Sequence, residues 1–317
     1  MAMTPPSCRP ARALLVTLAL AALAAAAAQP EGLGGELRTL VHDGLEREYY
    51  LYLPPDLPPG APLVVVLHGR GGTAEGMARL TGYDEVAARH GFAVVYPQGV
   101  DDQWNYVAGI EGYDLAADDI GFLRALVAEL VSAHGLDPGR VYAVGFSNGG
   151  FMAQRLACAA RDVFAAFASV SAAGYAGLPE VCGPGAPVSL LFIHGTDDTV
   201  VPFGGMAADT PSGPVLILAS VQQTVSYWAV FAGCEPHVTS RTVPPSGLSP
   251  GTEVVVYSVA GCQDGHELEL VVVFGGGHAW PGRPGLLPEE VAGRVNRDID
   301  ASGYVWEFFA RQPPLAE

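Results

Sequence analysis

The fold of this chain is decided by Val141-Tyr142-Ala143-Val144-Gly145-Phe146-Ser147-Asn148-Gly149-Gly150. An apolar run leads into a serine flanked by glycines, and an apolar helical pattern follows. This is the strand–turn–helix context in which a G-x-S-x-G segment exposes a nucleophilic serine above a sheet. Glycines suit a turn too tight for flanking side chains, and a helix N-terminus favours developing negative charge. Ser147 is therefore a candidate nucleophile; the alternative is a glycine-rich turn with a capping serine.

Apolar runs and helical patterns alternate on both sides of this stretch. Unbroken apolar runs such as 63–67 are typical of strands buried on both faces of a parallel sheet. Asp43-Gly44 joins segments 37–42 and 46–53 and predicts a β-hairpin. Further expected strands are 92–96, 141–146, 164–171, 188–194, 254–259 and 268–274; expected helices are 74–90, one from Asp118-Asp119 to Gly135, one after Ser147, 221–231 and 299–311. This order predicts an α/β-hydrolase fold, a mostly parallel sheet with helices on both faces, as one domain over 29–317.

An acid and a base follow the serine in the order that this fold uses. The apolar strand 190–193 runs into a polar loop that holds Asp197 and Asp198, and either could be the acid. The strand 271–274 runs into a glycine turn that carries His278. A serine hydroxyl needs such a base to take its proton. His194 precedes the acid, so it breaks the expected order.

The chemistry also needs backbone donors for a developing oxyanion. One should be the N–H of Asn148, directly after the candidate nucleophile. The other should come from the loop His68-Gly69-Arg70-Gly71-Gly72, which resembles the H-G-G-G pattern of esterases. We expect the N–H of Arg70 to be that donor, with Gly71 second, and His68 to brace the loop.

Composition narrows the setting in which the protein works. The 317 residues carry a net charge of -17, and all 16 basic residues are arginines. An acidic surface repels phosphate backbones, so we expect no nucleic-acid partner. Arg9 and Arg12 precede the apolar run 13–28, which predicts a signal peptide cleaved near Ala28 and hence secretion. The run is marginal for a stable membrane anchor, which needs about 20 apolar residues.

Cleavage would leave four cysteines: Cys158, Cys182, Cys234 and Cys262. An even count in an exported chain predicts two disulfides. Three pairings are possible, and we favour the sequence-local one, Cys158 with Cys182 and Cys234 with Cys262. The cysteine and histidine spacings imply no metal site, and no organic cofactor is expected.

Six motifs together resemble one family, the extracellular polyhydroxybutyrate depolymerases and feruloyl esterases of the α/β-hydrolase superfamily. They are H-G-R-G-G at His68, Y-P-Q-G at Tyr96, D-D-I-G-F at Asp118, G-F-S-N-G-G at Gly145, H-G-T-D-D-T-V-V-P at His194 and G-G-G-H-A-W-P-G at Gly275. The resemblance runs from about Leu37 to Ala310.

The resemblance implies a triad of Ser147, Asp198 and His278, because the family's acid is the fifth residue of its H-G-T-x-D stretch. It supports two disulfides at the four cysteines. Trp104 and Trp280 resemble positions that line the substrate pocket, and core packing is the alternative for both. Polymer depolymerases of this type usually carry a linker and a polymer-binding domain. This chain ends directly after its last expected helix, so we expect poor attack on crystalline polymer.

The sequence therefore predicts a secreted serine esterase that works through an acyl-enzyme. Its substrate would be a polyhydroxyalkanoate-type polyester, its oligomers, or a feruloyl (phenolic) ester. One alternative is a peptidase or amidase of the same fold, although no segment resembles a propeller or lid domain. The other is a binding protein that has lost catalysis; such proteins usually lack a triad residue, whereas all three are present here.

Overall fold

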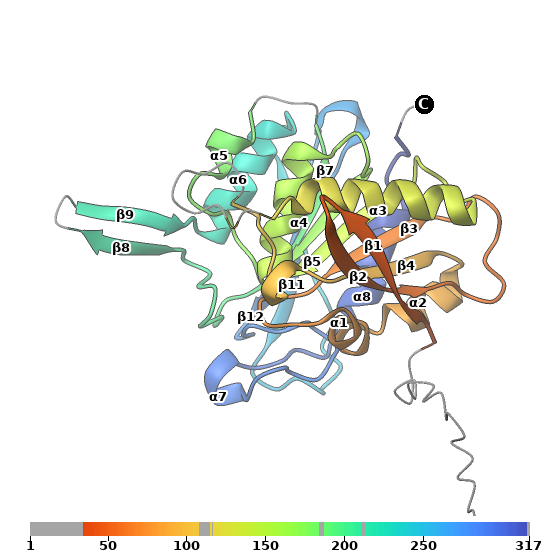
Figure 1. Cartoon of the computed structure of the whole chain (residues 1–317). Coiled ribbons are helices and arrows are strands. Elements are labelled where there is room, and N and C mark those ends of the chain that lie inside the picture. The colour runs from red at the N-terminus through yellow and green to blue at the C-terminus, as the bar shows by residue number, and fades with distance from the viewer. Residues whose placement is uncertain (1–33, 108–114, 116, 184–186, 211–212, 316–317) are drawn as a thin grey trace, which may run out of the picture. The chain divides into compact units, whose positions relative to one another are not determined.

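The computed structural model describes residues 34–107, 115, 117–183, 187–210 and 213–315 (Figure 1). The expected signal peptide, residues 1–28, lies outside this range. Within the described residues, every helix is too short or too polar to cross a bilayer.

A ten-stranded sheet forms the centre of the described chain, in the order β1-β2-β4-β3-β5-β6-β7-β12-β11-β10. The pairs from β4 through β12 are parallel, and the pairs at the two edges are antiparallel. This arrangement confirms the mostly parallel sheet expected from the sequence. The strands are β1 Glu36–His42, β2 Leu45–Tyr52, β3 Leu63–Leu67, β4 Ala93–Pro97, β5 Val141–Phe146, β6 Ala166–Val170, β7 Ser189–Gly195, β10 Val238–Thr242, β11 Glu253–Val259 and β12 Leu268–Phe274.

Helices cover both faces of this sheet (Figure 1). In β3, alternate residues point to opposite faces: Val65 packs in the core with α3, α4 and α6, and Val66 in the core with α1, α2 and α8. Burial on both faces explains why β3 is apolar throughout. The helices are α1 Ala74–Thr81, α2 Tyr83–His90, α3 Asp119–His134, α4 Asn148–Ala159, α5 Leu178–Val181, α6 Val221–Phe231, α7 Glu289–Ala292 and α8 Ala301–Ala310.

Local turn chemistry sets several of the element boundaries. Asp43 and Gly44 both have positive φ, 49° and 76°, as a two-residue type I′ hairpin turn requires, and the β1–β2 hairpin is confirmed. Gly135 ends α3 in the left-handed conformation, also as expected. The predicted helix 74–90 is wrong as one element. Gly82 takes φ 60° and divides it into α1 and α2.

Three strands were missing from the sequence-based prediction. β8 Met206–Thr210 and β9 Gly213–Leu218 form a separate two-stranded hairpin, which extends away from the large sheet (Figure 1). β10 is exposed at all five positions, so it lacks the apolar run that marks a buried strand.

Two disulfides close loops on the α4 and α6 side of the sheet. Cys158, in the last turn of α4, bonds to Cys182 after α5, and Cys234 after α6 bonds to Cys262 after β11. This is the sequence-local pairing. Each bridge restrains the end of a helix that packs on the sheet.

Candidate active site

Ser147 lies in a strained turn between β5 and α4. Its φ of 53° and ψ of -115° are unusual for a residue with a side chain. The flanking glycines make the turn possible, because a Cβ at Gly145 would lie 2.0 Å from the Gly149 carbonyl oxygen. A Cβ at Gly149 would lie 2.3 Å from the Leu67 carbonyl oxygen. The G-x-S-x-G spacing is therefore a steric requirement of this turn.

Backbone hydrogen bonds fix the turn at the carboxyl end of β5. The N–H of Ser147 donates to the Val170 carbonyl at 2.9 Å, and the N–H groups of Gly150 and Phe151 donate to the Ser147 carbonyl. The N–H groups of Asn148 and Gly149 begin α4 and have no hydrogen-bond acceptor in the described chain. Donors at a helix N-terminus are suited to an anion.

Asp198 and His278 form a buried pair at the ends of β7 and β12. Asp198 Oδ2 lies 2.8 Å from His278 Nδ1, and Asp198 Oδ1 accepts the N–H groups of Val200 and Val201 at 2.9 and 2.8 Å. Asp198 is 4% exposed and His278 is 7% exposed. The other candidate acid, Asp197, is exposed and accepts from the neighbouring Thr196 hydroxyl. The geometry thus selects Asp198 as the partner of His278.

His278 also lies beside the residue that precedes Ser147. Its ring centroid is 4.9 Å from that of Phe146, and the Ser171 hydroxyl donates to the carbonyl of the next residue, Ala279, at 3.1 Å. The bond to Asp198 occupies Nδ1 and leaves Nε2 for another partner. Among the described residues no hydrogen bond joins Nε2 to the Ser147 hydroxyl, a bond that in free enzymes often forms only with substrate.

A segment distant in sequence holds the His278 turn in place. The N–H of Gly277 donates to the Arg294 carbonyl at 2.8 Å, and the N–H of His278 donates to the Ala292 carbonyl at 2.5 Å. The Thr199 hydroxyl, next to Asp198, donates to the Val291 carbonyl at 2.6 Å. We call residues 291–294 the brace segment, because it bonds to both the acid loop and the histidine turn.

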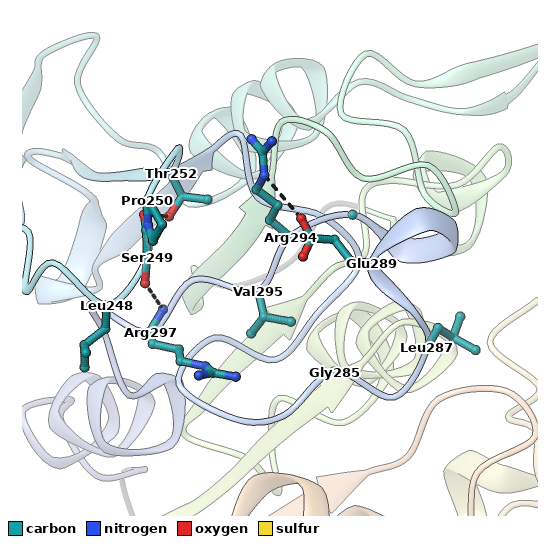
Figure 2. A pocket seen from close by; sticks show the side chains of 11 residues that line it. Leu248, Ser249, Pro250, Thr252, Gly285, Leu287, Glu289, Arg294, Val295 and Arg297 are labelled. Atoms are coloured by element: carbon teal, nitrogen blue, oxygen red, sulfur yellow. Dashed lines mark hydrogen bonds and ion pairs between the residues drawn. The ribbon is translucent and has the colours of Figure 1, made fainter.

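The brace segment borders a surface pocket of about 430 Å³ (Figure 2). In this pocket Arg294 pairs with Glu289 at 3.3 Å, and Leu248, Leu287 and Val295 provide apolar walls. Ser147, Asp198 and His278 are not among the residues that line it. The pocket is therefore separate from the candidate catalytic residues.

The loop after β3 offers the second expected backbone donor. Gly69 and Gly72 close a turn, with Gly72 N–H donating to the Gly69 carbonyl and Gly71 at φ 73°, as a type II turn requires. The N–H of Gly71 donates to the Asp102 carbonyl at 2.8 Å and is thus occupied. The N–H of Arg70 has no acceptor in the described chain. Arg70 therefore remains the candidate donor, and Gly71 does not.

His68 braces this loop as a neutral imidazole. The N–H of Gly99 donates to Nε2 at 2.9 Å, so the ring proton is on Nδ1, which donates to the Gly69 carbonyl at 2.8 Å. Burial lowers the pKa of His68 because it disfavours the charged form. The structural role expected for His68 fits these contacts.

The two tryptophans expected to line the pocket lie in the core instead. Trp104 is 0% exposed, and its indole N–H donates to the His68 carbonyl. Trp280 is 1% exposed, and its indole N–H donates to the Ser302 hydroxyl. Because each indole is packed and hydrogen-bonded internally, neither offers a face to substrate. The backbone N–H of Trp104 donates to Asn148 Oδ1 at 2.7 Å, so Trp104 helps to fix the residue after Ser147.

A buried ion pair that sequence analysis missed joins β2 to the first residue of α3. Arg47 lies 2.7 Å from Asp119, and the same guanidinium donates to the Gln98 carbonyl. The other Asp119 oxygen accepts the N–H of Asn105 at 2.7 Å. Asp119 belongs to the D-D-I-G-F motif at the expected helix start. That position could have indicated an ion pair with a basic residue from a distant segment.

Three aromatic side chains gather one turn along α4 from Ser147. Phe151 stacks on Tyr106 with ring centroids 5.0 Å apart, and Tyr175 lies edge-on to Tyr106 at 4.9 Å. Burial raises the pKa of Tyr106, and the positive charge of Arg70 opposes that shift. Tyr106 is half-buried and packs against the hydrophobic core.

One group of side chains in the described chain has the spacing of metal ligands. Ligand atoms of His42, Asp43 and Asp118 all lie within 4.8 Å of one another. Both aspartates are exposed, and Asp118 already caps α3 by accepting the Gly121 N–H. That backbone hydrogen bond lowers the pKa of Asp118. Helix capping accounts for Asp118, and the β1–β2 hairpin turn accounts for Asp43.

Ser147, Asp198 and His278 follow β5, β7 and β12, three parallel strands of one mostly parallel sheet, which is the arrangement of an α/β-hydrolase. Comparison with a solved structure agrees with this class. The acetyl xylan esterase from Aspergillus awamori superposes with a TM-score of 0.56 at 18% identity, covering 77% of this chain and 94% of that one.

Sequence comparison identifies the family. Residues 47–179 match the family Esterase PHB depolymerase. The chain is 36% identical over 283 residues to "Putative esterase NocK" of Nocardia uniformis subsp. tsuyamanensis, covering 86% of this chain and 81% of that protein. The chain therefore belongs to the Esterase PHB depolymerase family, and it is an esterase.

Two further relatives carry more specific names. Feruloyl esterase B of Piromyces equi is 30% identical over 224 residues, or 69% of this chain and 40% of that protein. Poly(3-hydroxyalkanoate) depolymerase C of Paucimonas lemoignei is 27% identical over 288 residues, or 83% of this chain and 66% of that protein. The chain spans less than two thirds of either relative.

Proposed function

We propose that the chain is a serine esterase in which Ser147, His278 and Asp198 act as a triad. The observation that carries this proposal is the buried 2.8 Å contact between His278 Nδ1 and Asp198 Oδ2. This contact fixes the orientation of the imidazole and leaves Nε2 available to act as the base. The ring stands beside Phe146, directly before the strained Ser147.

The proposed reaction has two halves. In the first half, Ser147 Oγ attacks the ester carbonyl while His278 takes the proton of the Ser147 hydroxyl. The tetrahedral intermediate then expels the alcohol, which receives that proton from His278. Water, deprotonated by His278, then attacks the acyl-enzyme. The carboxylic acid leaves, and the proton returns to Ser147. Asp198 stabilises the imidazolium that forms in each half.

The N–H groups of Asn148 and Arg70 would hold the oxyanion in both halves. Both lack acceptors in the described chain, and Asn148 also has the positive end of the α4 dipole. Arg70→Pro removes the donor and should lower kcat by about 10²–10³-fold. Arg70→Ala keeps the N–H, so its kcat should stay within about threefold; equal losses in both variants would contradict this assignment.

Replacing the proposed nucleophile tests the mechanism directly. Ser147→Ala should lower kcat/KM for 4-nitrophenyl butyrate by about 10⁴-fold or more, because nucleophile and base act as a unit. A fluorophosphonate probe should label the wild-type enzyme at Ser147, located by peptide mass spectrometry, and should not label the variant. The matched control is Ser246→Ala, which removes the hydroxyl of an exposed serine and should keep full activity. Wild-type hydrolysis by Ser147→Ala would exclude the proposal.

We propose a polyhydroxyalkanoate-type polyester, its oligomers, or a feruloyl ester as the substrate. The names of the Paucimonas and Piromyces relatives support these two classes. A panel of methyl ferulate, hydroxybutyrate oligomers and 4-nitrophenyl esters of increasing chain length separates them by kcat/KM. Preference for peptide anilides over every ester would exclude both classes and favour an amidase.

We also propose that residues 1–28 are removed on export and that 29–317 act as one catalytic domain. Two disulfides support an oxidising compartment. Amino-terminal sequencing of the protein recovered outside the producing cells should begin at Gln29. Recovery of the activity only inside the cells would contradict export.

A further inference from the structure

A second buried histidine lies against the candidate catalytic acid. His194 is 1% exposed, and its Nε2 is 3.5 Å from Asp198 Oδ2, the oxygen that also contacts His278. His194 belongs to β7, whereas Asp198 lies four residues later in the loop that follows. The proposed proton transfers do not use His194, so its place beside the acid calls for another role.

The hydrogen bonds of His194 define its protonation and its partner. Nε2 lies 2.8 Å from the Val201 carbonyl, which can only accept, so Nε2 carries the ring proton. The N–H of Val201 donates in turn to Asp198 Oδ1 at 2.8 Å. His194 thus anchors the residue that anchors the carboxylate, and the acid loop is tied back to β7 at this point.

The charge state of His194 matters because two histidines face one carboxylate. Burial lowers the pKa of His194, Asp198 opposes this shift, and His278 adds to it. Asp198 and His278 are the titratable groups that face His194 from the loops after β7 and β12. A charged His194 would compete with the imidazolium of His278 for Asp198. A neutral His194 leaves Asp198 as the counter-ion of His278 alone.

We propose that His194 is a positioning residue that fixes the Asp198 carboxylate for His278 through the Val201 carbonyl. This inference rests on the proposed triad. The required group is a neutral N–H donor at the position of His194 Nε2. A glutamine amide can place its nitrogen near that position, whereas the shorter asparagine amide reaches only the position of Nδ1.

The test compares His194→Gln with His194→Asn, two variants of similar polarity that differ in reach. For 4-nitrophenyl butyrate, His194→Asn should lower kcat by about 10-fold or more, because small misplacement of a catalytic group is costly, with KM changed by less than about threefold. The acid limb of the kcat/KM profile should move to lower pH, because a displaced Asp198 stabilises the imidazolium of His278 less. His194→Gln should keep kcat within about threefold and keep the wild-type limb.

Three outcomes would overturn the positioning role. These are wild-type kinetics in His194→Asn, equal losses in both variants, and a loss of kcat without movement of the acid limb. Urea unfolding of both variants identifies any folding defect, and the Gln–Asn comparison is made on the folded fraction titrated with fluorophosphonate. An active Ser147→Ala enzyme would instead refute the proposed function, so the two failures are distinguishable.

Discussion

The turn that carries Ser147 and the turn that carries His278 are both glycine-rich, but they are fixed in different ways. The Ser147 turn is fixed by close backbone packing against neighbouring strands, since Gly145 and Gly149 permit backbone contacts that no side chain would allow. The His278 turn is held from outside, by the carbonyls of Ala292 and Arg294. The first turn therefore depends on steric contacts with the buried strand ends, and the second on hydrogen bonds to a segment outside the large sheet.

This difference explains how perturbations should act on each turn. A side chain added at Gly145 or Gly149 would collide with backbone atoms and oppose the packing of β5 and α4. Such a substitution should therefore lower the unfolding free energy. Changes in the brace segment leave the sheet intact and act on the position of His278. Substitutions in the two regions should consequently separate stability from catalysis.

The largest expected effect is that of Gly149→Ala. Its Cβ would meet the Leu67 carbonyl oxygen at 2.3 Å and the His68 carbonyl oxygen at 2.7 Å, and both are backbone atoms of the buried strand end. We expect a loss of more than about 4 kcal/mol in unfolding free energy, measured by urea denaturation, or no soluble protein. The matched control is Gly204→Ala, where a Cβ meets nothing within 4 Å. A folded Gly149→Ala enzyme of wild-type stability would remove the steric basis of the comparison.

Gly293→Ala should have a smaller effect, mainly on catalysis. Gly293 has φ 83° and ψ -177°, and a Cβ there would lie 2.7 Å from Gly277 Cα, next to His278. We expect kcat to fall about 10–100-fold, with a loss of about 1–3 kcal/mol in unfolding free energy from the strained backbone. Steady-state kinetics and urea denaturation of one preparation give both numbers. Full activity despite the lower stability would show that the brace segment does not control His278.

The smallest expected effect is a pH dependence of stability. His68 is buried against the loop after β3, and His194 is buried against the loop that carries Asp198. Burial lowers the pKa of both histidines below 6.5. As the pH falls through 6.5, the unfolded chain binds protons that these folded imidazoles do not. The contribution of these histidines to the unfolding free energy should be constant above this pH. Below it the unfolding free energy should decline, by at most about 1.4 kcal/mol per pH unit for each histidine.

Urea titrations at pH 7.5, 6.5 and 5.5 measure this slope. His194→Gln should show a shallower decline than the parent, because one of the buried imidazoles has been removed. An unchanged slope in this variant would mean that His194 binds its proton equally in the folded and unfolded chains.

The sequence was informative where local chemistry determines the structure. The parallel strands were predictable because burial on both faces demands apolar runs, as in β3. The order of Ser147, Asp198 and His278 was predictable because each follows such a run. Asp198 and His278 do form a buried pair, and their roles in catalysis stay a prediction until the variants are measured.

The rest depended on contacts between segments far apart in the chain. The brace segment has no periodic pattern, and its effect is exerted through backbone carbonyls that any residue could supply. The hairpin of β8 and β9 exposes Val215, Leu216 and Ile217, so its apolar residues do not indicate burial. Trp104 was misplaced because an aromatic residue in a loop looks the same whether it faces substrate or fills the core.

The two disulfides have a mechanical consequence for a chain pulled from its ends. They close loops of 24 and 28 residues in sequence separation. At about 3.3–3.6 Å per extended residue, roughly 170–190 Å of contour length stays locked while the bridges are intact. The β8–β9 hairpin lies between the two loops in sequence, so neither bridge restrains its extension. The contour length of a fully stretched single molecule should therefore differ by this amount with and without reductant. The measured length then reports how many of the two disulfides are closed.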